Sequence, residues 1–361
     1  MARVAKLARN VSYMKISISV SSPAWDRDAF KEQLIYVQEA ERMGADTVWT
    51  VEGWGQDAAT PLAYLAARTK TIKLGTAIMQ ITARAPAMTA MTAMTLSSLS
   101  EGRFILGLGS SGSQIVGGLH GQSFERPLAR MKETIETIQA AFAGEKITIS
   151  GEQIKLPLPG GEGKPMRLAQ PPNEKIPLYL ATLGPKSLEY TGQIAQGWIG
   201  TAFTPERADA LLDPIWAGAE SAGRDKTQID VHVGVASVAF DKDIHSLVQP
   251  LKMGKAFTLA AMGSKKTNFY NDAYSKSGWV EVAEKVRNLW LKGQRHQAAQ
   301  SIPDEIVLQT NLIGTEEMIE ERLRVYRKTG VNTLKVAPVA SNLKERINTL
   351  GKIIDLAANS A

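Results

Sequence analysis

The sequence of 361 residues contains no cysteine. Disulfide bonds, thiolate metal sites and cysteine nucleophiles are therefore excluded, and the chain is compatible with a reducing compartment such as the cytosol. Histidine is nearly as scarce, because the chain has four, scattered without the spacing of metal ligands. We therefore predict no metal site. His232 falls within an apolar strand-like run, where a buried structural histidine is the simplest interpretation.

Apolar stretches of membrane-spanning length are also missing, and the first 13 residues lack the apolar core of a signal peptide. We predict a cytoplasmic protein with no membrane partner. The excess of positive charge is small as well. The formal net charge is +6, and Arg3, Lys6 and Arg9 supply half of it from a predicted N-terminal extension, residues 1–13. The rest of the chain is too weakly basic for a nucleic-acid partner, since such proteins concentrate Lys and Arg on one face.

Strand-like and helix-like runs alternate through the rest of the chain, which predicts parallel strands joined by helical crossovers. Eight strand–helix units indicate an α/β fold, a (β/α)8 TIM barrel formed by a single domain over residues 14–361. Two doubly wound domains are the alternative topology. The strand-like runs are residues 14–20, 47–53, 72–80, 104–109, 176–184, 197–202, 230–240 and 332–338.

Two irregular segments interrupt this repeat. The first, about residues 144–175, follows the helix after strand four and contains a predicted hairpin. The second, about residues 241–300, follows strand seven. We expect both insertions to roof a substrate site, with an apolar or aromatic pocket that has some attraction for anions. The aromatic residues that suggest this pocket lie among lysines and are Phe257, Phe269, Tyr270, Tyr274 and Trp279.

In a barrel of this kind, chemistry takes place at the carboxyl ends of the strands. Strand four runs into the glycine- and serine-rich loop 107–113, which formally matches the pattern G-x-G-x-x-G. A Rossmann dinucleotide site is disfavoured, because neither the immediate helix nor the later acidic residue of that fold follows. Small residues with available backbone N–H groups favour a cradle for a phosphate or a ring edge. A plain tight turn is the alternative.

Two further strand ends carry candidate residues. After strand five, Gly184, Pro185 and Lys186 would present a helix N-terminus and a cation to an anion, unless they only start an ordinary helix. After strand two, Glu52 and Trp54 could serve proton transfer and ring stacking. A loop salt bridge and a packed indole would explain this second pair equally well.

The helix after strand three carries methionines at three-residue spacing, at positions 88, 91 and 94. A stripe of this kind on one helix face is most simply interpreted as packing against the barrel. We therefore predict a buried position for all three side chains and assign them no functional role.

Three long segments together resemble one known family, the bacterial luciferase-like superfamily, over nearly the whole chain from Met14 to about Leu356. They read LGTAIMQITARAPAMTAMTAMTLSSLSEGRFILGLGSSG, IPLYLATLGPKSLEYTGQIAQGW and GTEEMIEERLRVYRKTGVNTLKVAP. Within the superfamily, the chain is most similar to the branch that uses coenzyme F-420, an 8-hydroxy-5-deazaflavin. This resemblance implies a TIM barrel, a cofactor across its C-terminal mouth and often a homodimer. It also implies a non-proline cis peptide bond, here Ala77-Ile78, behind the deazaflavin ring.

The resemblance also implies site residues, which we carry over by position. Several deazaflavin dehydrogenases have a histidine after the strand-two acid and a glutamate in the strand-four loop, where this chain has Gly53 and Gly112. Glu52 is therefore the residue to which we assign a catalytic role. The predicted cofactor-binding residues are Thr76, Ala77, Ile78 and Gln80 with Glu52 at the ring, Ser110, Ser111, Gly112 and Ser113 at the ribityl and phosphate region, and Thr182, Leu183, Gly184, Pro185 and Lys186 at the phosphate.

The function implied is hydride transfer between carbon 5 of reduced coenzyme F-420 and a small organic carbonyl, imine or alkene. In such an enzyme, the protein mainly supplies orientation and exclusion of water. An FMN-dependent monooxygenase of the same superfamily is the first alternative. A deazaflavin-binding protein without turnover is the second, because the histidine and the glutamate of the dehydrogenases are missing.

Overall fold

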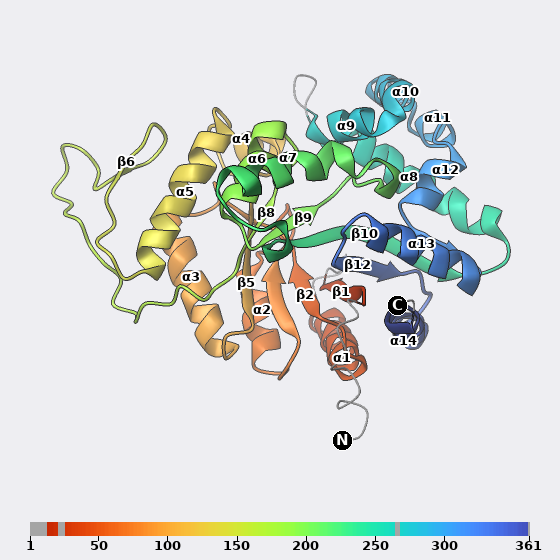
Figure 1. The fold of residues 1–361 in the computed structure, drawn as a ribbon, viewed down its shortest axis with the longest axis horizontal. Helices are drawn as coiled ribbons and strands as arrows, with labels where there is room; N and C mark the ends of the chain where they lie inside the picture. Colours follow the sequence, from red (N-terminus) through yellow and green to blue (C-terminus); the bar gives the residue numbers. More distant parts are fainter. Residues whose placement is uncertain (1–12, 21–25, 264–267, 360–361) are drawn as a thin grey trace.

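Residues 13–20, 26–263 and 268–359 are described by a computed structural model of the chain. Within them, eight parallel strands close into a barrel in which β12 pairs with β1 to complete the circle (Figure 1). The predicted α/β TIM barrel is therefore confirmed. The barrel strands are, in order, β1 (Lys15–Val20), β2 (Thr47–Thr50), β3 (Lys73–Thr76), β5 (Phe104–Gly109), β8 (Leu178–Ala181), β9 (Gly197–Gly200), β10 (Asp230–Phe240) and β12 (Thr333–Pro338).

Helices follow the strands and cover the outside of the barrel (Figure 1). The first shows how local sequence sets the boundaries. Asp26 accepts hydrogen bonds from the first turn of α1, and Gly44 ends it with a left-handed φ of 92°. The helices of the repeat are α1 (Arg27–Met43), α2 (Ala59–Ala66), α3 (Pro86–Leu99), α4 (Ser113–Gly118), α5 (Pro127–Phe142), α6 (Pro185–Ile194), α7 (Asp209–Ser221), α13 (Glu316–Lys328) and α14 (Leu343–Asn359).

Large side chains fill the middle of the barrel. Trp49 lies 5.9 Å from the ring of Tyr179 and 4.8 Å from that of His232, measured between ring centroids. Two glycines make room for these rings. A Cβ atom at Gly75 would lie 2.3 Å from Trp49, and one at Gly197 would lie 2.4 Å from Tyr179. The barrel is therefore closed at mid-height, and any open space must lie toward its ends.

Two short strands extend the predicted pattern. Beyond the barrel, β10 continues and pairs with β11 (Leu312–Gly314), so one edge of this long strand pairs first with β9 and then with β11. β4 (Met79–Gln80) continues the path of β3 and pairs with β5. The predicted N-terminal extension, residues 1–13, lies outside the described residues except for Tyr13.

The first insertion is bound to the outside of the barrel. Its hairpin, β6 (Ile149–Ser150) and β7 (Lys155–Leu156), projects beyond α5 on the left of Figure 1. The carboxylate of Glu133 in α5 accepts hydrogen bonds of 2.8, 2.9 and 2.6 Å from three consecutive N–H groups of this hairpin, at residues 152–154. The hairpin is thereby held against α5.

The second insertion is helical and lies on the opposite side of the molecule, at the upper right of Figure 1. A kinked turn at Ser275–Trp279, in which Gly278 has a left-handed φ of 90°, joins two of its helices. The helices are α8 (Ile244–Ala260), α9 (Phe269–Tyr274), α10 (Val280–Leu291) and α11 (Arg295–Gln300), followed by α12 (Asp304–Gln309).

The methionines of α3 do not all pack inward. Met94 is buried, but Met88 and Met91 are 50% and 42% exposed. The predicted core stripe is therefore wrong for two of its three members. The reason is geometric: a step of three residues covers about 300° of a helix, so the two steps from Met88 to Met94 drift across its surface and leave the buried face.

Candidate functional site

A cavity of about 1390 Å³ opens among the loops that follow the barrel strands. It is large compared with ordinary ligand pockets of roughly 300–1,000 Å³. Residues 51–56, 77–78, 109–115 and 181–187 line it, so it collects the ends of β2, β3, β5 and β8. The predicted site at the C-terminal mouth therefore coincides with a single large cavity.

Small residues make this space. Above the ring layer formed by Trp49 and Tyr179, the next lining residues on four strands are Ala77, Gly109, Ala181 and Thr201. Each follows by two positions a residue of the same strand path, and side chains two positions apart share a face of a strand. These four small residues leave open space directly above the rings of Trp49 and Tyr179, and the cavity begins there.

Most predicted cofactor-binding residues line the cavity. They include Ala77 and Ile78, which are joined by a cis peptide bond as the resemblance implied. Thr76 and Gln80 do not line it. Thr76 and Gln80 are both fully buried behind the cavity wall. The hydroxyl of Thr76 donates a 2.8 Å hydrogen bond to the carbonyl of Gly107.

The loop after β5 and the start of α6 form another part of the wall. Ser110 to Ser113 and Thr182 to Lys186 all line the cavity. Ser111 has a φ of 59°, a left-handed conformation that is uncommon for a residue other than glycine. Gly184 is the N-cap of α6, whose first turn carries no side-chain cap. The first N–H groups of a helix lack partners within that helix, so this wall can bind an anion.

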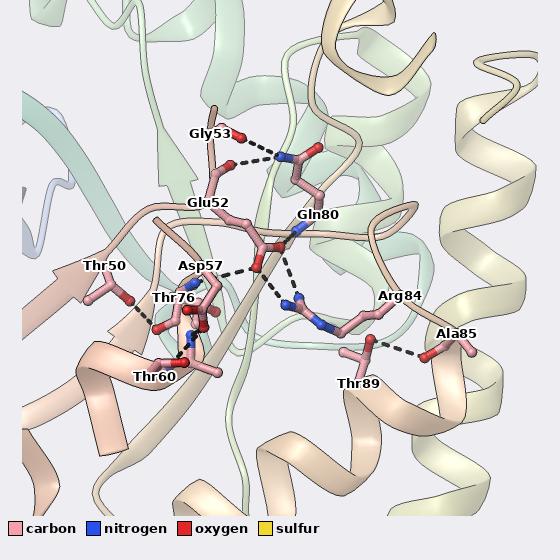
Figure 2. A network of polar contacts seen from close by, with 12 residues as sticks. Thr50, Glu52, Gly53, Asp57, Thr60, Thr76, Gln80, Arg84, Ala85 and Thr89 are labelled. Carbon is pink, nitrogen blue, oxygen red and sulfur yellow. Dashed lines mark hydrogen bonds and ion pairs between the residues drawn. The ribbon is translucent and has the colours of Figure 1, made fainter. Parts of the chain in front are cut away.

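Glu52 is held by a dense polar network (Figure 2). Its two carboxylate oxygens lie 2.7 and 2.9 Å from the guanidinium nitrogens of Arg84. They also accept from the N–H groups of Gln80 at 2.9 Å and Ala58 at 3.4 Å. The side-chain amide of Gln80 donates in turn to the backbone carbonyls of Glu52 and Gly53 at 3.0 and 3.3 Å. The carboxylate therefore ties the end of β2 to β4 and to the segment that follows it.

One titratable residue that lines the cavity escaped the sequence analysis. Lys335 in β12 is 6% exposed and lines the cavity. Burial lowers the pKa of Lys335 from 10.5 to about 8. A signal for it was present in the sequence, because Leu334 and Val336 flank it within an apolar strand. In a barrel strand, residues alternate between the helices and the interior, so a lysine between two apolar residues points inward.

Below Lys335 lies His232, whose Nε2 is 2.8 Å from the hydroxyl of Ser17. Burial first, and then the positive charges of Lys335, Lys15 and Lys73, hold the pKa of His232 well below 6.5. The imidazole is therefore neutral at physiological pH. The predicted buried position of this histidine is confirmed.

The second insertion supplies an aromatic wall. Phe257, Phe269 and Tyr270 line the cavity, whereas Tyr274 and Trp279 do not. Burial raises the pKa of Tyr270. No residue of the first insertion, 144–175, lines the cavity, although all of them are described. The expectation that both insertions roof the site is therefore wrong for the first, which Glu133 holds against the outside of α5.

The described residues contain neither a cluster of metal-binding side chains nor a membrane-spanning helix. In residues 13–20, 26–263 and 268–359, no three His, Asp or Glu side chains are grouped closely enough to hold a metal ion. The same part of the chain has no helix with the length and apolarity needed to span a membrane.

The large cavity at the mouth of the barrel, the cis peptide bond at Ala77-Ile78 and the glycine- and serine-rich loop are features expected of a luciferase-like barrel. Sequence comparison gives the same class. The profile of the luciferase-like monooxygenase family matches residues 12–333. The chain belongs to this family.

Individual relatives refine the comparison. A protein of Mycobacterium tuberculosis, whose name assigns it provisionally to the coenzyme F-420-dependent oxidoreductases, is 35% identical over 83% of this chain and 88% of its own length. A 5,10-methylenetetrahydromethanopterin reductase of Methanolobus tindarius is 30% identical over 88% of this chain and 94% of its own.

One solved structure supports the fold. The coenzyme F-420-dependent tetrahydromethanopterin reductase of Methanopyrus kandleri superposes with a TM-score of 0.76 at 23% identity, covering 94% of this chain and 98% of that one.

Proposed function

We propose that this protein is a coenzyme F-420-dependent oxidoreductase that transfers a hydride between the reduced coenzyme and a small organic carbonyl, imine or alkene. The observation that carries the proposal is the cavity of about 1390 Å³, on which three segments predicted to bind the cofactor lie together. The names of the two relatives support the choice of coenzyme. The proposal includes a cytoplasmic location, which cell fractionation would test.

The residues around the cavity fit such a cofactor. Small side chains at the inner end leave space for a flat ring against Ala77 and Ile78. Ser110 to Ser113 and the start of α6, with Lys186 beside it, would hold the phosphate-bearing tail. When bound, the reduced coenzyme supplies a hydride from carbon 5 of its deazaflavin ring. The protein's part is to hold that ring beside the substrate and to exclude water.

We assign Glu52 a positioning role within this site. The sequence-based prediction of proton transfer stays a prediction, but the four contacts of the carboxylate favour a different function. A general acid or base must reach the substrate proton, and the Glu52 oxygens are already directed at Arg84 and two backbone N–H groups. Through these contacts Glu52 would fix the loop that bears Gly53 and Trp54 and the chain that continues from Ala77 and Ile78.

Equilibrium binding tests the cofactor assignment. We would titrate the protein with oxidised and reduced coenzyme F-420 and with FMN, monitored by cofactor fluorescence. We expect coenzyme F-420 to bind more tightly, and Lys186→Met to weaken it by about tenfold because a charge-assisted contact is lost. Lys31→Met, on the exposed face of α1, is the matched control. Failure of both cofactors to bind below millimolar concentration would disprove the assignment.

A second candidate function follows from the family itself, which is named for monooxygenases. An FMN-dependent monooxygenase would bind FMN in preference to coenzyme F-420 and would consume oxygen with a flavin reductase present. A deazaflavin-binding protein without turnover would bind coenzyme F-420 tightly and transfer no hydride to any carbonyl or alkene. The same titration, followed by a turnover assay, separates all three.

We also propose that the protein is a homodimer. Helix α3 has no charged residue between Pro86 and Leu99, and Met88, Met91 and Leu99 are 50%, 42% and 56% exposed. An uncharged face with several exposed apolar side chains is typical of a surface that is covered in an assembly. Light scattering should give a dimeric mass that Met88→Lys with Met91→Lys reduces to a monomer. Met318→Lys, at an equally exposed methionine on charged α13, should leave it unchanged. A monomeric wild type would contradict the proposal.

A further inference from the structure

Among the described residues, four titratable side chains line the cavity: Glu52, Lys186, Tyr270 and Lys335. Three of them are committed elsewhere or poorly suited to donate a proton. The carboxylate of Glu52 is bound by Arg84, and Lys186 is exposed at the start of α6. The pKa of Tyr270 is raised by burial, which makes its hydroxyl a weaker acid. Lys335 is the remaining candidate.

Lys335 differs from the other lysines in its surroundings. It is 94% buried, and no hydrogen bond or ion pair to its ammonium group is found in the described part of the chain. By contrast, the equally buried Lys252 lies 2.6 Å from a carboxylate oxygen of Asp304. A buried charge is costly unless something pairs with it. Because Lys335 lines the cavity, the missing partner can be supplied by a bound molecule.

The position of Lys335 is suited to a substrate. It lies on β12, whereas the wall formed by Ala77 and Ile78 continues β3, so the two lie on different strands around one cavity. The ring layer, in which Trp49 packs against both His232 and Tyr179, lies below this part of the cavity. A substrate could stack between the proposed deazaflavin ring, against Ala77 and Ile78, and the aromatic wall of Phe257 and Phe269. One end of such a substrate would then contact Lys335.

We infer that Lys335 is a catalytic residue that donates a proton to the oxygen of a carbonyl substrate whose body is apolar or aromatic. The inference rests on the proposed hydride transfer and narrows its substrate class to carbonyl compounds. The carbonyl carbon accepts the hydride, and the electron pair of the broken C=O π bond moves to oxygen. That oxygen takes a proton from Nζ to give the alcohol, while the reduced coenzyme is oxidised by two electrons. The neutral amine then regains a proton from solvent.

The lowered pKa of Lys335 suits its role as a proton donor. A pKa near 8 leaves the ammonium largely protonated at neutral pH and makes it a better acid than an ordinary lysine. Of the groups facing it, His232 on β10 is neutral and Ser17 on β1 does not titrate. The carbonyl-reducing activity should therefore fall as pH rises through about 8.

The first experiment needs no cofactor. Competitive acetylation of the free protein with acetic anhydride at a series of pH values, quantified by mass spectrometry of peptides, should show Lys335 gaining reactivity with a midpoint near pH 8. Benzoate should protect Lys335 from acetylation, because it offers an anionic oxygen on an aromatic body. Benzamide, its neutral counterpart, should not. An ordinary midpoint near 10.4, or equal protection by both molecules, would overturn the inference whether or not coenzyme F-420 binds.

The second experiment measures turnover. Lys335→Met should lower kcat/KM for ketones and aldehydes by about 100-fold or more and remove the alkaline limb of the pH profile. Lys335→Arg keeps the charge but cannot release a proton, so it should bind carbonyl compounds and remain slow. Lys73→Met, a lysine at the other end of the barrel that pairs with Asp46, is the control.

The outcomes of these experiments separate the two claims. If the wild-type protein does not bind coenzyme F-420, the proposed function is refuted. The acetylation experiment still decides the role of Lys335. Wild-type rates or an unchanged alkaline limb in Lys335→Met would refute the inference alone. Turnover of alkenes without turnover of any carbonyl compound would also refute it.

Discussion

Glu52 and Lys335, the two buried charges that line the cavity, differ in whether neighbouring residues pair with them. Glu52 is 8% exposed and accepts four hydrogen bonds, two of them from Arg84. Lys335 is 6% exposed and has no partner among the described residues. Burial alone therefore does not distinguish them. The difference lies in whether the fold itself satisfies the charge.

This difference indicates how each charge is used. A carboxylate with all its partners in place stabilises the local structure and is no longer available for chemistry. An ammonium group that the fold leaves unpaired lowers the stability of the folded state and is available to a ligand. Stability measurements can test this distinction without any substrate.

The largest effect should come from breaking the satisfied pair. Arg84→Met leaves the Glu52 carboxylate buried with two backbone donors, and we expect the free energy of unfolding to fall by about 3–5 kcal/mol. Urea denaturation monitored by tryptophan fluorescence measures this change. Arg42→Met, which breaks an exposed pair with Glu39, should leave the free energy of unfolding nearly unchanged. A loss below about 1 kcal/mol for Arg84→Met would mean that the network contributes little.

Removing the unsatisfied charge should have the opposite sign. Lowering the pKa of Lys335 from 10.5 in the unfolded chain to about 8 in the folded chain corresponds to about 3 kcal/mol of instability at neutral pH. Lys335→Met should therefore raise the free energy of unfolding by up to about 3 kcal/mol at pH 7, as its activity falls.

The pH dependence gives this second prediction a direct check. Between about pH 8 and 10.5, the unfolded wild-type chain retains a proton on Lys335 that the folded chain has lost, so wild-type stability rises with pH. The advantage of Lys335→Met should shrink across that interval. Lys73→Met, which removes a partly exposed lysine paired with Asp46, is the control. A destabilised Lys335→Met at pH 7 would show that Lys335 has a structural partner.

The contrast also explains what the sequence could and could not reveal. The barrel was predictable because its strands are apolar runs separated by helix-forming segments, and β10 was predicted with the bounds it has in the structure. The cis bond at Ala77-Ile78 followed from the resemblance alone. The partner of Glu52 was not predictable, because Arg84 lies 32 residues away and reaches it only through the path of β3 and β4.

Two other failures have the same physical origin. The insertion at 144–175 is polar and rich in turns, like a lid, but its place is set by three hydrogen bonds to one buried carboxylate, Glu133, in a neighbouring helix. The apolar neighbours of Lys335 indicate that it points into the barrel, but nothing local marks this lysine as unpaired. Only the closed barrel shows which side chains face it and which charges are absent.

A smaller effect should distinguish the two possible roles of Glu52. Glu52→Gln keeps the shape and one acceptor oxygen but weakens the contacts with Arg84, at a cost of about 1.5–3 kcal/mol. If Glu52 positions the loop, kcat/KM should fall by no more than about tenfold, with the pH profile unchanged. Loss of about 100-fold together with loss of one limb of the profile would instead support proton transfer by Glu52.

The smallest effect should be a change in the pKa of His232, which lies below Lys335 and is sensitive to its charge. The pKa of His232 is well below 6.5 because of burial and because of Lys335, Lys15 and Lys73. Lys335→Met removes one of these positive charges, so the pKa of His232 should rise while staying below its ordinary value. NMR spectra of the carbon-bound imidazole protons during an acid titration measure this shift. The exposed His245 should not move.

The same substitution should change stability in acid in a defined direction. Below about pH 6.5, the unfolded chain binds a proton at His232 that the folded chain rejects, so stability falls as pH falls. In Lys335→Met the folded chain accepts that proton more readily, and the loss should be shallower by less than about 1 kcal/mol. An unchanged pKa of His232 would mean that the Lys335 ammonium is screened from its neighbour. A screened charge would need a partner, and the contrast with Glu52 would then disappear.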